Sequence, residues 1–97
     1  MKVFYTEEAE KCICDIFDYI AYDNYDNAIA VRNRMKEAID RLEDFPDSGA
    51  YPKHPKLRVR GYRFVVSDNY LVFYKLKSDA VIIMTVIHGS RDYNNLI

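Results

Sequence analysis

The most distinctive chemistry in the sequence is a run of cationic side chains at residues 53–63. This segment reads Lys-His-Pro-Lys-Leu-Arg-Val-Arg-Gly-Tyr-Arg, with five formal positive charges and no acid. Guanidinium and ammonium groups at this density favour phosphate. We therefore expect Lys56, Arg58 and Arg60, together with Arg91, to contact the phosphates of RNA. The alternative interpretations are a seat for an acidic protein segment and a plain solvated surface. Surface for stacking of bases would come from Tyr62, Tyr70, Tyr74 and Tyr93.

Three further side chains have the chemistry of RNA cleavage without a metal. That reaction needs a group that helps to deprotonate the 2′-hydroxyl, a cation at the scissile phosphate and an acid for the leaving oxygen. His88, Arg63 and Tyr93 are suitable residue types and are our candidate catalytic residues. His88 follows an apolar run and precedes Gly89, which predicts a position where a strand opens into a loop. A structural role for His88, hydrogen bonding at a sheet edge, is the alternative.

No metal or cofactor site is indicated. The chain has two histidines and two cysteines, and their spacing matches no metal-ligand pattern. Three glycines are too few for a phosphate-binding loop, and no serine lies in a nucleophile-elbow sequence. We therefore expect neither a metal nor a cofactor.

Length and composition point to one small globular domain over residues 1–97. The chain is 49% hydrophobic, 30% charged and has a net charge of −1, which disfavours intrinsic disorder. No apolar run approaches the ~18 residues of a membrane helix, and the acidic start does not resemble a secretory signal. Cys12 and Cys14 do not form a disulfide framework. We expect a cytoplasmic protein with no membrane partner.

Hydrophobic periodicity predicts a short strand, two helices and then three strands. The expected ranges are strand 2–5, helix 7–22, a helix from the turn at 23–26 to Phe45, and strands 57–66, 70–76 and 80–87. Thr6 is the expected N-cap of the first helix, and Pro46 ends the second. Leu57 and Val59 alternate with three cations, which predicts a strand that carries the cations on one face.

The order β-α-α-β-β-β predicts an α+β fold. In this fold an antiparallel helical hairpin packs on one face of an antiparallel sheet whose last three strands form a meander. We expect the opposite face to be partly open and to carry the positive charge.

The chain resembles the RelE/ParE superfamily of toxins from bacterial type II toxin–antitoxin systems over essentially its full length. The similarity lies in four segments taken in order. They are Leu42-Glu43-Asp44-Phe45-Pro46-Asp47-Ser48-Gly49, Gly61-Tyr62-Arg63, Asn69-Tyr70-Leu71-Val72-Phe73-Tyr74 and Val86-Ile87-His88-Gly89-Ser90-Arg91-Asp92-Tyr93.

This resemblance implies a growth-inhibiting toxin that a cognate antitoxin neutralises, with operator DNA bound only through the antitoxin complex. RelE-like members are metal-independent nucleases that cleave mRNA on the ribosome, with strand-borne cations and a C-terminal Tyr or His. Arg58, Arg60, Arg63, His88 and Tyr93 would occupy comparable places. The basic segment puts this mechanism slightly ahead.

Two alternatives stay open. ParE-like members lack nuclease activity and poison DNA gyrase, and the ending at residues 87–92 is more similar to that branch. A sequence pI of about 6.1 and the absence of an arginine at Met84 and Thr85 also favour it. The third reading is an inactive toxin that survives as an interaction module and co-repressor.

Overall fold

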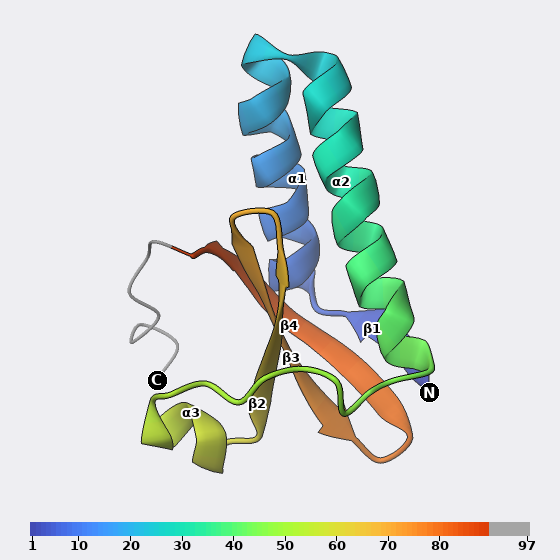
Figure 1. The fold of residues 1–97 in the computed structure, drawn as a ribbon, viewed down its shortest axis with the longest axis vertical. Helices are drawn as coiled ribbons and strands as arrows, with labels where there is room; N and C mark the ends of the chain where they lie inside the picture. The colour runs from blue at the N-terminus through green and yellow to red at the C-terminus, as the bar shows by residue number, and fades with distance from the viewer. Residues whose placement is uncertain (90–97) are drawn as a thin grey trace.

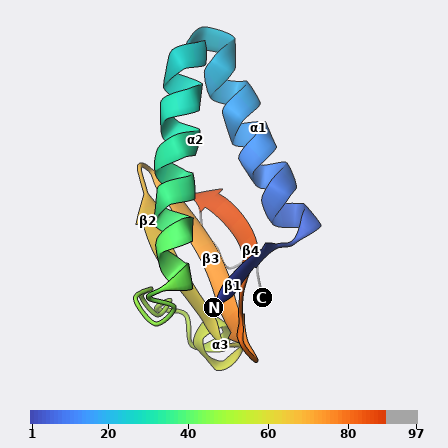
Figure 2. The ribbon, with the colours of Figure 1, turned by 90° about the vertical axis from the view of Figure 1, so that its right-hand side faces the viewer.

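The protein folds as a helical hairpin packed on a four-stranded sheet. The computed structural model describes residues 1–89. Its elements are β1 (Lys2–Tyr5), α1 (Glu7–Asp23), α2 (Tyr25–Asp40), a 3-10 turn (Arg41–Glu43), α3 (Pro55–Val59), β2 (Tyr62–Ser67), β3 (Tyr70–Lys77) and β4 (Ala80–His88). The hairpin of α1 and α2 extends well beyond the sheet, and α3 lies at the other end of the molecule (Figure 1). The second view shows the same arrangement (Figure 2).

The sheet is mixed, with strand order β1-β4-β3-β2. The β2–β3–β4 meander is antiparallel, as expected, whereas β1 pairs with β4 in parallel. The predicted α+β fold with its antiparallel meander is confirmed, and the pairing of β1 is what differs from the predicted antiparallel sheet. The helical hairpin returns the chain to the end of the sheet where β1 begins, since the Met1 ammonium donates to the Glu43 carbonyl (2.7 Å). β2 and β4 therefore run in the same direction as β1.

Thr6 connects the first strand, the first helix and β4. Its hydroxyl oxygen accepts a hydrogen bond from the Ala9 N–H (3.0 Å), which caps α1 as predicted. The same hydroxyl donates to the carbonyl of Met84 (2.9 Å). Met84 lies at a β-bulge, because Phe73 pairs with Thr85 while Tyr74 pairs with Ile83. The N-cap of α1 is thus fastened to the irregular point of the central strand.

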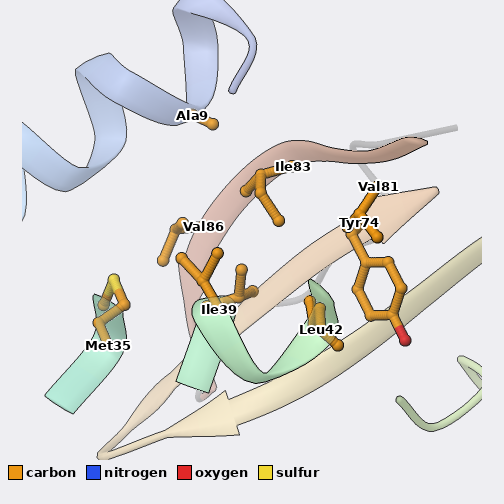
Figure 3. Packing of buried hydrophobic residues seen from close by; sticks show 9 residues of the cluster. Ala9, Met35, Ile39, Leu42, Tyr74, Val81, Ile83 and Val86 are labelled. Atoms are coloured by element: carbon orange, nitrogen blue, oxygen red, sulfur yellow. The ribbon is translucent and has the colours of Figure 1, made fainter. Parts of the chain in front are cut away.

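The main core lies between the helical hairpin and the sheet. Helical side chains such as Met35 and Ile39 pack against Val72, Val81 and Ile83 of the strands. Figure 3 shows Tyr74 at the margin of this cluster, with its hydroxyl directed away from the apolar side chains.

The opposite face of the sheet is covered in part by α3. Leu57 is fully buried there against Tyr62 and Phe73. This face is therefore apolar directly under α3. The cations of residues 56–60, which were predicted to lie on a strand of this face, lie on and just after α3 instead.

Residues 57–60 are the main error in the predicted elements, since they form a helical turn and not a strand. Pro55 occupies the first turn, where its missing N–H costs nothing, and His54 Nδ1 accepts the Lys56 N–H (3.2 Å) as the N-cap. Val59, predicted to be inward-facing, is 87% exposed. Gly61 then takes a positive φ of 87°, which reverses the chain into β2. The alternation of apolar and cationic residues is compatible with a strand and also with one short helical turn that buries only Leu57.

The remaining boundaries are close to those predicted. The α-helical part of the second helix ends at Asp40, and the chain continues as the 3-10 turn before Pro46. β3 and β4 begin at the expected residues, and β2, β3 and β4 each end one residue later than predicted.

Candidate functional site

Most of the basic segment belongs to α3 and the residues that flank it, and α3 lies at the end of the molecule opposite the tip of the α1–α2 hairpin (Figure 1). We call the set Lys53, Lys56, Arg58, Arg60 and Lys75 the basic cap. The first four are exposed and lie on α3 or directly beside it. Lys75 joins them from β3, where it pairs with Tyr62 and places its Nζ 4.5 Å from the centre of that ring. Because Tyr62 packs against Leu57, Lys75 shares the sheet face that α3 covers.

Tyr51 links the cap to the neighbouring loop. Its ring lies 5.4 Å from the Arg58 guanidinium carbon and 4.4 Å from that of Arg63. Stacking of this kind is a preferred arrangement for arginine. The ring is 53% exposed, so one tyrosine holds two guanidinium groups in place at the surface.

The Arg63 side chain holds the loop before α3 through hydrogen bonds and an ion pair. Its guanidinium donates to the Asp47 carbonyl (3.1 Å) and to the Tyr51 hydroxyl (2.6 Å). It also lies 3.7 Å from the Asp47 carboxylate, and its side chain is only 18% exposed. Arg63 was predicted to contact a scissile phosphate, but its guanidinium is already engaged by these contacts within the protein.

Tyr74 secures the same loop from within the sheet. Its hydroxyl donates to the Pro46 carbonyl (2.8 Å) and accepts the Gly49 N–H (2.9 Å). Burial raises the pKa of this phenol, against the opposing effects of the Gly49 N–H and the Arg63 charge. The hydroxyl therefore stays protonated and can donate.

His88 lies elsewhere, at the exposed end of β4. Its ring meets Tyr70 edge to face at 5.5 Å, on one side of a cleft of about 530 Å³. Cys12 and Asp15 of α1 line the same cleft. The prediction of a strand end opening into a loop is confirmed for this residue.

The structure does not bring His88 and Arg63 together. Arg63 pairs with Tyr74 of β3, and His88 pairs with Tyr70 of the same strand. The two positions are thus about 13 Å apart along the strands and about 10 Å apart across them. Tyr93 and Arg91 lie outside the described residues. Of the predicted phosphate ligands, Lys56 and Arg58 lie on α3 instead of a strand, and Arg60 follows as the C-cap of this helix.

Residues 1–89 contain no group of three or more His, Cys, Asp or Glu side chains placed to hold a metal ion. Cys12 is partly buried and Cys14 is exposed, and both are free thiols. Within the same residues, no helix has the length and apolar character needed to cross a membrane.

Sequence reasoning missed Tyr51, His54 and Lys75. The contact of Tyr51 with two arginines has no signal in residue spacing, because it joins a loop, a helix and a strand. The position of Lys75 near the basic segment could have been predicted from the β2–β3 hairpin, in which Lys75 pairs with Tyr62. His54 lies in the loop and caps α3, a role suited to a side chain that precedes Pro at the first helical turn.

A helical hairpin on one face of a small mixed sheet, followed by an antiparallel meander, defines the RelE/ParE class of toxins. Residues 3–93 match the family described as "ParE toxin of type II toxin-antitoxin system, parDE", and the chain belongs to this family. No curated protein matches the sequence. A solved structure described as "Chromosomal ParDE TA system from P. aeruginosa" shares the fold, with a TM-score of 0.74 and 16% identity. The match covers 91% of this chain and 95% of that one.

Proposed function

We propose that this toxin inhibits growth by acting on DNA gyrase in the cytoplasm and does not cleave RNA. Membership of the ParE family supports this mechanism. The near-neutral charge of the whole chain also supports it, because a nuclease that docks on ribosomal RNA needs a strongly basic surface.

The separation of Arg63 from His88 is the observation that carries the proposal. General acid–base catalysis requires its groups within hydrogen-bonding reach of one reacting centre. Here Arg63 of β2 pairs with Tyr74 of β3, whereas His88 of β4 pairs with Tyr70, four residues away on the same strand. The Arg63 guanidinium is also held by Asp47 and Tyr51. A cleavage site built on this pair would need the sheet itself to rearrange.

The proposed partner is a cognate antitoxin, which also carries the complex to operator DNA. A suitable surface is a groove of about 570 Å³ between α1, α2 and the edge strand β1. Val3, Ile13 and Met35 supply apolar lining, and charged side chains line it as well. An amphipathic antitoxin segment fits this combination of apolar floor and charged rim.

The test is induced expression in cells with two parallel readouts. New 5′ ends of mRNA report RNA cleavage, and double-strand breaks in DNA report gyrase poisoning. We expect broken DNA, intact mRNA and inhibition of supercoiling by purified gyrase. Co-expression of the antitoxin should abolish every effect.

The basic cap is the observation that favours the second candidate, ribosome-dependent mRNA cleavage. Cleavage within translated codons with intact DNA would establish that mechanism and overturn ours. Absence of any growth effect, with antitoxin binding intact, would identify the inactive interaction module.

A further inference from the structure

Four cations of the basic cap form no ion pair with acids of the described chain. Among residues 1–89, Lys53, Lys56, Arg58 and Lys75 form no ion pair, whereas Arg34 pairs with Asp68 and Arg63 with Asp47. The lysines of the helical hairpin differ from those of the cap, because Lys11 and Lys36 each form an ion pair with an aspartate one helical turn away. These four residues therefore concentrate positive charge without a paired acid, on a chain whose net charge is −1.

Acidic side chains are concentrated in another part of the molecule, so the charge distribution is asymmetric. Residues 7–26, which form α1 and the hairpin turn, hold seven acidic side chains and one lysine. The turn and α3 lie at opposite ends of the longest dimension, which measures 39 Å (Figure 1). A polyanion attracts one end of such a molecule and repels the other, so approach is restricted to the α3 end.

The cap is also held rigid before any ligand arrives. Leu57 is fully buried and anchors α3 to the sheet. The Arg58 guanidinium rests on the Tyr51 ring, which Arg63 fixes in turn through the 2.6 Å hydrogen bond to its hydroxyl. Side chains ordered in advance lose less entropy on binding.

We propose that the basic cap binds the phosphodiester backbone of a duplex nucleic acid. The protein would approach with its α3 end, and the contact would not depend on the base sequence. Backbone contact alone is expected, because a helix of five residues is too short to lie along a major groove. Phosphate is favoured over an acidic peptide because two exposed cations, Lys56 and Arg58, lie on one short helix, and arginine pairs well with phosphate. This proposal goes beyond gyrase inhibition and is tested on the purified toxin alone.

The experiment measures fluorescence anisotropy of a labelled DNA duplex and an RNA duplex of the same sequence, titrated with the full-length toxin across a range of salt concentrations. We expect both to bind, with log affinity falling linearly with log salt. The double variant Lys56→Ala/Arg58→Ala should reduce the salt slope by about 2 and weaken binding at low salt by about tenfold or more.

The matched control is Lys11→Ala/Lys36→Ala, which removes the same charge from the exposed hairpin. It should leave the slope unchanged, and circular dichroism should show that both variants are folded. An equal loss in the control would mean that only net charge matters and would overturn the proposal. Binding to poly-glutamate with no binding to either duplex would also overturn it. Binding to only one of the two duplexes would overturn the proposal as well, because a contact to the backbone alone should hold both.

Discussion

The hydroxyl of Tyr74 and the backbone of Gly49 are in direct contact, and this contact closes the loop that precedes α3 onto the sheet. The Gly49 N–H lies 2.9 Å from the Tyr74 oxygen, and a Cβ added at Gly49 would lie 2.3 Å from the same atom. Glycine is required here for close approach, because any side chain would overlap a fully buried ring.

Gly49→Ala should lower the free energy of unfolding by about 1–3 kcal/mol, the usual cost of overpacking. Chemical denaturation monitored by tyrosine fluorescence measures it. The double variant with Tyr74→Phe should not recover the loss, because the Tyr74 Cε1 atom would still lie 2.6 Å from the new Cβ. Full recovery would show that the hydroxyl alone excludes a side chain at this position.

Tyr74→Phe alone should cost about 1–3 kcal/mol, since it leaves the buried Gly49 N–H without its partner. It should also change the response to alkali. Burial raises the pKa of Tyr74 above its ordinary value of 10.0, so the unfolded chain loses this proton at lower pH than the folded one. Stability is therefore complete below about pH 10 and falls as pH rises through the folded pKa. The variant should show a shallower alkaline decline, and an identical decline would exclude Tyr74 as its source. Some decline should remain, because burial also raises the pKa of Tyr5 and Tyr70.

Thr6→Ala should lower the free energy of unfolding by about 1–2 kcal/mol, because it removes the cap of α1 and the bond to Met84 at the bulge. Thr6→Ser is the matched control and should retain most of the stability, since it keeps the hydroxyl. Thermal unfolding of both variants measures the difference. Equal losses would show that the methyl group matters and the hydrogen bonds do not.

Arg63→Ala separates the two mechanisms. If Arg63 only fixes the loop, the variant should lose about 1–2 kcal/mol of stability and remain toxic at temperatures where it is folded. His88→Ala should remain toxic as well. Growth after induction, together with the melting temperature of each variant, gives the result. Loss of toxicity with unchanged stability would restore the proposed catalytic role of that residue.

Cys14→Glu tests the proposed antitoxin surface. Cys14 is exposed and lines the groove between the helices and β1, so a carboxylate there would have to be desolvated on binding. We expect antitoxin affinity to fall by about tenfold or more, equivalent to about 1.4 kcal/mol. Cys14→Ser should bind normally by calorimetry. Unchanged binding of the glutamate variant would place the antitoxin elsewhere.

The sequence by itself determined the elements whose periodicity extends over several turns or strand residues. The Thr6 cap, both long helices and the three strands after Gly61 were all readable. Each rests on local physics: a capping hydroxyl, a helical stripe of apolar residues, or a β-branched run such as residues 80–87. The resemblance in four ordered segments was enough to indicate the toxin class.

Tertiary structure alone decided the rest. Five residues around Leu57 are too few for their period to distinguish a strand from a helical turn, and the choice depends on Leu57 finding a pocket against Tyr62 and Phe73. The distance between Arg63 and His88 is likewise a property of strand order and register, which bring Arg63 to Tyr51 and carry His88 away to the far end of β4. Local sequence states what a side chain can do, whereas long-range pairing decides which other side chains it meets.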